Sequence, residues 1–528
     1  MELKKQNFIK GSIILMVSAA AAKVLGAVFK IPLTNMLGGV GMSYFSCAYS
    51  IFMPVYALTV TGLSAAVARM TARSAALGMY ANARRIRRTA LLLFSAAGLA
   101  GSLLILLLAV PFSVYTVGSR DGAAAVAMIA PAVVFGCITA VERGYYEGMS
   151  NMYPTAVSQL AEGGVKAAAG LFLCGYVTAH PNTVMGLFPF MTDVRGAAAA
   201  AGIAGVTLST VGAAAFFAVL RLFDRAPTGG ESLMQSRRAI AKELLTTALP
   251  VGAGAVVTNL TALIDMWTVI GCISVFGYPG KAPAGVSATE LPNFIYGSFA
   301  GIALTVFNLV PSVTNMLGKG ALTCITAARE SGDRSAMERG TMQALLTSAA
   351  IAIPSAVGLG VMAPEVLGIL YPAQSDEVAV CTAPLRWLMA GMVCLCVSYP
   401  LFSMLQAVGK ASAPLKIMLF GTAVKLLGNL LLIPLMGVSG AALSTSLCYG
   451  GILLLALRTY LKVSGLRLSF VPLGKAVYSG AMCGGAACLV RSAAYRAGAS
   501  PFTALIFSAL AGGIVYTFLI RGLIGRLR

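Results

Sequence analysis

The sequence is poor in charged residues. Of its 528 residues 10% are charged and 58% are hydrophobic, and the mean hydropathy is +0.86. Soluble domains are typically about 45–50% apolar and about 25% charged, and one soluble core stops growing near about 250–300 residues. The 38 basic and 17 acidic residues could not cover the surfaces that a soluble chain of this length would need. We therefore exclude a soluble or disordered protein and expect a chain that lies mostly in lipid.

Patterns for metal and nucleotide binding are also missing. There is one histidine, His180, and the eleven cysteines include no Cys-x-x-Cys pair, so the close ligand spacing of a zinc site is absent. Most of the cysteines lie in apolar runs, where cysteine behaves as a small hydrophobe. No Gly-x-x-x-x-Gly-Lys-Ser/Thr loop occurs, which argues against an ATPase built into the chain. We expect no cofactor, no metal and no catalytic residue.

Long apolar runs, by contrast, are abundant. A bilayer core about 30 Å thick requires about 20 apolar residues per helix. Runs such as residues 91–110 show no alternation of polar and apolar side chains, which favours helices over the strands of a β-barrel. We predict an all-α membrane protein with fourteen spans, at residues 11–31, 44–68, 89–110, 123–141, 156–177, 197–220, 244–276, 291–317, 341–363, 383–405, 414–435, 440–457, 476–490 and 502–520.

The net charge of +21 can be read in two ways. A basic excess is typical of nucleic-acid-binding proteins, but membrane proteins also collect Lys and Arg in their cytoplasmic loops. With the N-terminus inside, the fourteen spans place 27 of the 38 basic residues, Arg143 among them, in cytoplasmic segments and five in outer loops. This bias predicts a multi-pass cell-membrane protein with both termini in the cytoplasm, and we expect it to be a monomer. Its cytoplasmic loops would contact anionic lipids, not nucleic acid.

Two short sequence echoes indicate an internal repeat. GIAGVTLST at 202–210 resembles GVSGAALST at 437–445, and ALTV occurs at 57–60 and again at 303–306. Each echo links a span to the sixth span after it, so the two halves would share one orientation and form a parallel repeat. We predict an N-terminal six-helix lobe, a cytoplasmic linker, a second six-helix lobe and two additional helices, over residues 1–220, 221–243, 244–457 and 458–528.

Ionisable residues within the spans are costly, about 2.5–3.5 kcal/mol each on insertion scales, so they indicate a substrate or ion pathway. Six are basic and two are acidic. Lys23 and Lys30 share a face of the first span, and Glu162 and Lys166, four residues apart, can pair along the fifth. Lys425 is the counterpart of Lys166 in the repeat. The basic excess predicts an anionic substrate, bound by Lys23, Lys30, Glu162, Lys166, Asp265, Arg386 and Lys425.

Structural explanations are open for some of these residues. Lys30 and Lys416 lie close to the ends of their spans, where a lysine can extend its ammonium group to the membrane surface. The pair of Glu162 and Lys166 can also be purely structural. Lys23 and Lys425 fit neither explanation, so they carry most of the argument for an anionic substrate.

Two segments resemble a known family. Residues 10–52 are similar to the first hairpin of the polysaccharide-export and stage V sporulation protein B branch of the MOP flippase superfamily. Residues 142–171, ERGYYEGMSNMYPTAVSQLAEGGVKAAAGL, resemble the branch's Arg-Gly-aromatic-aromatic-Gln-Gly-Met pattern followed by Pro-Thr-Ala and a Glu-plus-base pair. Glu147 stands where that pattern has Gln, and the second span has no charge before Arg69, where some flippases have an arginine.

The resemblance implies a two-lobed fold of twelve core helices plus two, and outward flipping of an undecaprenyl-linked sugar precursor by alternating access. Basic residues of a central cavity are thought to engage the pyrophosphate in lipid II flippases. Lys23 and Lys30 match basic positions of the branch's first span, and Glu162 with Lys166 matches its Glu-plus-base pair. A coupling ion, proton or sodium, is a further expected partner.

Two other functions are compatible with parts of the sequence. A cation-coupled multidrug exporter of the same superfamily would use Glu162 and Asp265 as ion sites. A membrane glycosyltransferase or polymerase would expose acidic or metal-binding residues in a large outer loop. The longest outer loops have about twenty residues, and their acidic pair Asp376 and Glu377 is typical of a solvated loop end.

Overall fold

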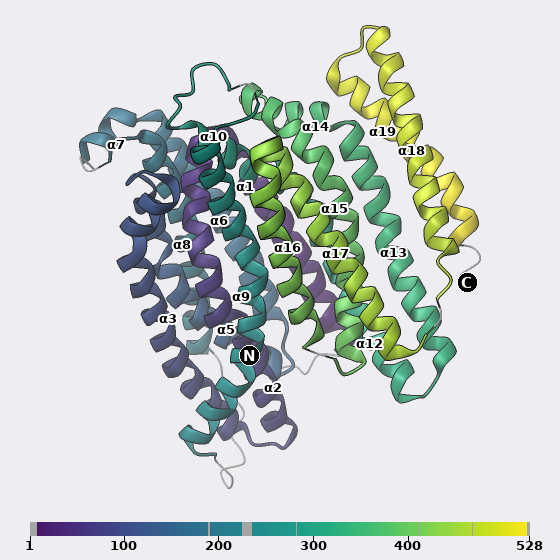
Figure 1. Cartoon of the computed structure of the whole chain (residues 1–528). Helices are drawn as coiled ribbons and strands as arrows, with labels where there is room; N and C mark the ends of the chain where they lie inside the picture. Colours follow the sequence, from purple (N-terminus) through teal and green to yellow (C-terminus); the bar gives the residue numbers. More distant parts are fainter. Residues whose placement is uncertain are drawn as a thin grey trace. The chain divides into compact units, whose positions relative to one another are not determined.

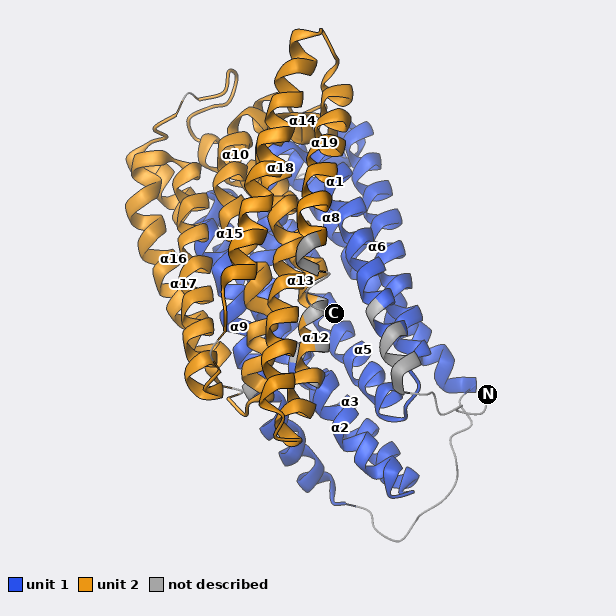
Figure 2. Ribbon diagram, turned by 90° about the vertical axis from the view of Figure 1, so that its right-hand side faces the viewer, with its two compact units in different colours: residues 1–266 blue, residues 267–528 orange. Residues whose placement is uncertain are grey.

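The computed structural model describes residues 8–187, 191–223, 235–280, 282–410, 412–466 and 468–524 (Figure 1). Helices account for nearly all of these residues, and no strand occurs among them. The chain divides into two compact units, residues 1–266 and 267–528, coloured separately in Figure 2. The division falls within helix α9, and the lobe boundaries predicted at residues 220 and 244 stay predictions.

The first unit is built from long helices joined by short connections. Its elements are α1 (Phe8–Tyr56), the π-helical turn η1 (Ala57–Thr61), α2 (Gly62–Ala76), α3 (Tyr80–Val117), α4 (Gly122–Ile129), α5 (Pro131–Gly148), α6 (Tyr153–Ala179), α7 (Pro181–Leu187), α8 (Val194–Phe223) and the first part of α9 (Arg237–Phe276). Ile240, Leu244 and Ala248 of α9 are buried in one apolar core with residues of α2, α3 and α5.

The second unit continues the pattern. Its elements are the end of α9, α10 (Leu291–Ser298), the π-helical turn η2 (Phe299–Ala303), α11 (Leu304–Phe307), α12 (Leu309–Glu330), α13 (Arg334–Val361), α14 (Ala363–Leu370), α15 (Ser375–Ala407), α16 (Ala413–Met436), α17 (Val438–Ser464), α18 (Val471–Arg496) and α19 (Pro501–Ile524). α18 and α19 lie side by side, and α18 also packs on α13 (Figure 1).

The described residues contain 12 helices long and apolar enough to cross a membrane, or 13 spans if the bent pair Leu291–Phe307 and Leu309–Asn315 counts as one. One of them, Val17–Ala76, has 60 residues. A straight helix of that length would measure about 90 Å, about three times the bilayer core. It is interrupted at Gly38, whose φ of 64° and ψ of −175° leave the helical region. If this interrupted helix is counted as two crossings and the bent pair as one, the total is fourteen, which agrees with the number of predicted spans.

The internal repeat is visible in how each unit packs. In the first unit α5 packs against α2 and α3, and α6 packs against α8. In the second unit α15 packs against α12 and α13, and α16 packs against α17. When each span of the first unit is compared with the sixth span after it, the helices that pack together in the first unit correspond to those that pack together in the second.

The glycine-rich echo has the same packing role in both units. A Cβ added to Gly205 of α8 would lie 2.3 Å from the Cα of Gly170 in α6. A Cβ added to Gly440 of α17 would lie 2.2 Å from the carbonyl oxygen of Leu432 in α16. No side chain fits at either position, because the backbones of the paired helices touch there. The glycine repeated in the sequence therefore marks a repeated close helix crossing.

The ALTV echo coincides with a second shared feature. η1 begins at the first ALTV and η2 ends where the second begins. Single π-helical turns inside α-helices are rare and are frequent at functional sites. Both units thus interrupt the corresponding helix with a π turn.

Two connections of the first unit are fastened by Asp121, which is buried at the start of α4. Its carboxylate accepts hydrogen bonds from the backbone and hydroxyl of Thr192, at 2.8 and 2.6 Å, from Ser119 at 3.0 Å, and from the backbone of Asp193 at 3.3 Å. Burial opposes ionisation, but these hydrogen bonds outweigh it and lower the pKa of Asp121 below its usual value. The ionised carboxylate therefore stabilises the folded connection.

Candidate functional site

Three basic side chains and one carboxylate gather among α1, α5 and α6 of the first unit: Lys30, Arg143, Glu162 and Lys166. We refer to these four residues as the basic cluster. Arg143 of α5 contacts Glu162 of α6 at 2.7 Å and donates through Nε to the hydroxyl of Ser158 at 2.9 Å. The Arg143 and Glu162 side chains are 17% and 26% exposed, so the ion pair is partly shielded. Such a pair ties α5 to α6.

The ammonium group of Lys166 is held by aromatic rings. Its Nζ lies 5.1 Å from the ring centre of Phe29 and 5.7 Å from that of Tyr49, within the range of cation–π contacts. Lys30, the residue after Phe29, is close enough to Lys166 for the two charges to interact. The pairing of Glu162 with Lys166 along one helix is thus corrected: the carboxylate pairs with Arg143 across two helices.

An aromatic row, Phe45, Tyr49, Phe52 and Tyr56, runs along the second half of α1. The spacings of four, three and four residues place all four rings on one helix face. Successive ring centres are 5.0, 6.1 and 4.9 Å apart. The ring of Tyr49 contacts the ammonium group of Lys166, and Tyr56 is close to both Glu162 and Arg143. The row therefore connects the two ends of the basic cluster.

The remaining predicted residues lie elsewhere. Lys23 is exposed on α1. Asp265 of α9 and Lys425 of α16 are buried, at 2% and 3% exposure. Arg386 of α15 is exposed and donates through Nε to the carbonyl of Gly360 at 3.3 Å. The structure thus brings Lys30, Glu162 and Lys166 together in one unit, and the substrate-binding role of all seven residues stays a prediction.

A second charged site has a structural character. Glu142 of α5 is fully buried and forms ion pairs with Arg87 of α3, at 2.5 Å, and with Arg221 of α8. The guanidinium of Arg87 also lies 4.5 Å from the ring centre of Tyr145 and 5.5 Å from that of Tyr146. We call Glu142 and its two arginines the Glu142 clamp, because one carboxylate fastens three helices.

Sequence reasoning missed two parts of these sites. The predicted span ends at residue 141, two residues before Arg143, whereas α5 extends to Gly148. Arg143 therefore lies within a helix and beside Glu162. The aromatic row went unnoticed, although its helical spacing was readable in the sequence. Neither the ion pair nor the cation–π contact could be read from spacing, since both join different helices.

Two repeated helical units in a polytopic membrane protein, with a basic cluster inside the first, are typical of a membrane transporter. Comparisons with known proteins agree with this class. The family model "Lipid II flippase MurJ" matches residues 190–508, and the model "Polysaccharide biosynthesis protein" matches residues 8–304. Each covers more than half of the chain. The chain belongs to the MOP flippase superfamily, in the families of these two models.

Two curated relatives from Bacillus subtilis (strain 168) are similar over most of their length. Stage V sporulation protein B is 25% identical over 448 residues, which cover 84% of this chain and 81% of the relative. Lipid II flippase MurJ is 22% identical over 463 residues, 84% of this chain and 80% of the relative. These matches agree with the resemblance found in the sequence.

Solved structures share the fold. A lipid II flippase MurJ in an inward closed conformation matches with a TM-score of 0.69 at 14% identity, over 98% of this chain and 100% of that one. An inward-facing multidrug resistance MATE transporter of the MOP superfamily matches with a TM-score of 0.66 at 15% identity, over 86% and 97%. At such identities the likeness concerns the fold alone.

Proposed function

We propose that this chain flips an undecaprenyl-pyrophosphate-linked saccharide, a peptidoglycan precursor or polysaccharide unit, from the cytoplasmic to the outer leaflet by alternating access. The charge balance of the basic cluster is the observation that supports this best. The cluster has three cations and one carboxylate, and the carboxylate of Glu162 is already engaged by Arg143. The cluster as a whole therefore has a net positive charge, which favours an anionic ligand.

The arrangement of Lys166 suits binding and release of a phosphate. Cation–π contacts hold the ammonium in place but use none of its three N–H donors. A pyrophosphate oxygen can thus accept a hydrogen bond without breaking an existing ion pair. Lys30 would supply a second cation in the first unit, and the buried Lys425 would supply one in the second unit. Each negative charge moved outward gains about 2.3 kcal/mol per 100 mV of inside-negative potential.

Flipping of a fluorescent lipid-linked saccharide in proteoliposomes tests the proposal. Losing one charge-assisted hydrogen bond of about 1.5–3 kcal/mol should slow flipping at limiting substrate about 10- to 100-fold in Lys166→Gln. Lys166→Arg keeps the cation and the ring contacts and should retain most activity. Lys416→Gln, an exposed lysine at the start of α16, is the matched control and should flip at the wild-type rate. Unchanged flipping by Lys166→Gln would remove the basic cluster from the mechanism.

A cation-coupled exporter is the competing function, and the burial of Asp265 gives it one specific support. In that case Asp265→Asn would abolish drug resistance conferred by the protein, whereas a flippase would confer none. Wild-type protein that confers resistance and moves no lipid-linked saccharide would refute our proposal.

A further inference from the structure

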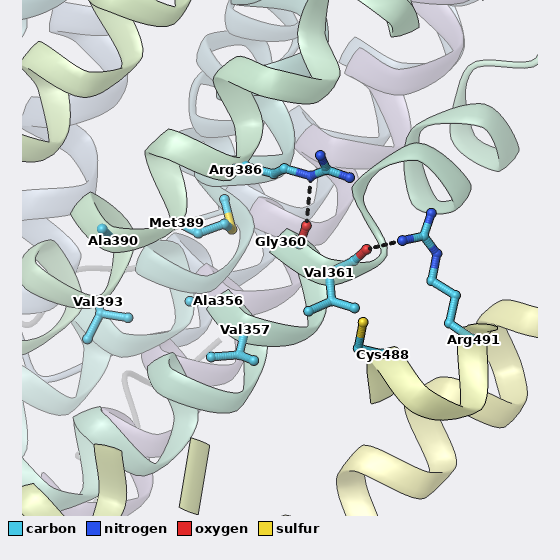
Figure 3. A pocket seen from close by; sticks show the side chains of 10 residues that line it. All are labelled: Ala356, Val357, Gly360, Val361, Arg386, Met389, Ala390, Val393, Cys488 and Arg491. Atoms are coloured by element: carbon cyan, nitrogen blue, oxygen red, sulfur yellow. Dashed lines mark hydrogen bonds between the residues drawn. The ribbon is translucent and has the colours of Figure 1, made fainter. Parts of the chain in front are cut away.

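A groove in the second unit lies among α13, α15 and α18 and has a volume of about 540 Å³ (Figure 3). Its walls are apolar and include Val357, Met389, Ala390 and Val393, while two arginines, Arg386 and Arg491, complete the lining. The volume is in the range of ligand pockets, about 300–1,000 Å³. We call it the α13–α15–α18 groove. The basic cluster lies in the other unit, so this is a separate feature.

Both arginines gather at one end of the groove, at the last turn of α13 (Figure 3). Arg386 donates through Nε to the carbonyl of Gly360 at 3.3 Å, and Arg491 donates through a terminal nitrogen to that of Val361 at 3.2 Å. Arg491 is also fixed by Glu365, whose carboxylate lies 2.6 Å from Nε and accepts from the hydroxyl of Tyr495 at 2.7 Å. Two guanidinium groups and one carboxylate leave a net positive charge there.

The position of Arg386 within the membrane makes this charge informative. Arg386 is exposed, eleven residues into a helix that is long and apolar enough to span a bilayer. A guanidinium cannot face acyl chains without a large cost, so it meets phosphate or water. Trp387 beside it is 44% exposed, and exposed tryptophan is typical of the membrane interface. The groove therefore combines apolar walls, which suit an acyl chain, with two arginines at one end, which suit a phosphate. This is the chemistry of a phospholipid site.

We propose that the α13–α15–α18 groove binds one anionic glycerophospholipid, with an acyl chain along the apolar walls and the phosphate on Arg386 and Arg491. Arginine suits this role, because its planar group can donate two parallel hydrogen bonds to a phosphate. The carbonyl of Gly360 accepts one hydrogen bond from Arg386, and that of Val361 accepts one from Arg491. The terminal nitrogens of Arg386 point away from Gly360 (Figure 3). In the predicted topology α13 ends on the outer side, so the lipid belongs to the outer leaflet.

The test is lipid retention by the purified full-length chain, read by native mass spectrometry after incubation with phosphatidylglycerol or phosphatidylethanolamine. Wild-type protein should retain phosphatidylglycerol preferentially. Arg386→Gln, which removes one cation without touching the Glu365 contacts, should lower retention about tenfold. Ala390→Phe should lower it by filling the groove while both arginines remain. Arg496→Gln, an exposed arginine of α18 outside the groove, is the control and should retain lipid like the wild type.

Equal retention of the two phospholipids by wild-type protein would overturn the proposal, as would full retention by Arg386→Gln and Ala390→Phe. Displacement of phosphatidylglycerol by undecaprenyl phosphate would also overturn it, because the groove would then belong to the substrate path. The assay measures no flipping, so its outcome is independent of the function proposed above.

Discussion

Replacing Glu142 by glutamine removes the only carboxylate of the Glu142 clamp and leaves two arginines. Arg87 is 10% exposed and cannot turn to water, whereas Arg221 is 44% exposed and can. Breaking a buried ion pair by removing one partner costs about 3–5 kcal/mol. The rings of Tyr145 and Tyr146 keep a cation–π contact with Arg87 that offsets about 1 kcal/mol. We expect Glu142→Gln to destabilise the protein by about 2–4 kcal/mol.

Thermal unfolding in detergent micelles, followed with a thiol-reactive fluorogenic dye, measures this effect. Cys137, on the same helix as Glu142, is buried and becomes reactive only when the helix packing opens. A loss of about 2–4 kcal/mol corresponds to a decrease of about 5–15 °C in Tm for a unit of this size. Arg221→Gln breaks only the half-exposed pair and should cost about 0–1 kcal/mol.

The double variant Arg87→Gln with Glu142→Gln separates a charge effect from a packing effect. It places two neutral amides where a buried cation and carboxylate met, so it should be more stable than Glu142→Gln alone by at least about 1 kcal/mol. The reasoning is refuted if Glu142→Gln unfolds at the wild-type temperature. It is also refuted if the double variant is less stable than the single one, because lost packing would then dominate.

Two more predictions concern the first unit. The pKa of Asp121 is lowered by its hydrogen bonds, so its contribution to stability is present above about pH 4 and is lost as pH falls through the folded-state pKa. Asp121→Asn should lower Tm at neutral pH and flatten its decrease below about pH 4, whereas the exposed Asp376→Asn should do neither. Gly205→Ala should cost at least about 3 kcal/mol or prevent folding, because its Cβ would meet the backbone of Gly170 at 2.3 Å. Gly212→Ala on the same helix meets nothing within 4 Å and should be tolerated or mildly stabilising in a thermal unfolding assay.

The fold could be predicted from the sequence because its main features depend on short stretches of neighbouring residues. Apolar runs of about twenty residues fix the spans, and the glycines of the nine-residue echo fix the close crossings at Gly205 and Gly440. The break at Gly38 lies between the first two predicted spans, at residues 32–43.

The candidate site was accessible only in part. The rarity of charges in apolar runs singled out Glu162 and Lys166, but not their partners. The partner of Glu162 depends on which face of α5 turns toward α6, and that of Lys166 on the rotation of α1. Rotational phase between helices is a property of the packed structure, so a single sequence without homologues does not determine it.

The π turn η1 lies between α1 and α2 and fixes the rotation of one relative to the other. It directly follows Tyr56, the last ring of the aromatic row, and directly precedes Gly62, whose added Cβ would lie 2.2 Å from the carbonyl oxygen of Ala248. A π turn holds one residue more than an α-helical turn, which corresponds to a rotation of about 100°. If η1 relaxed to α-helix, the rings and Gly62 could not both keep their partners. The five residues of η1 therefore act as an angular spacer between the basic cluster and the crossing of α2 with α9.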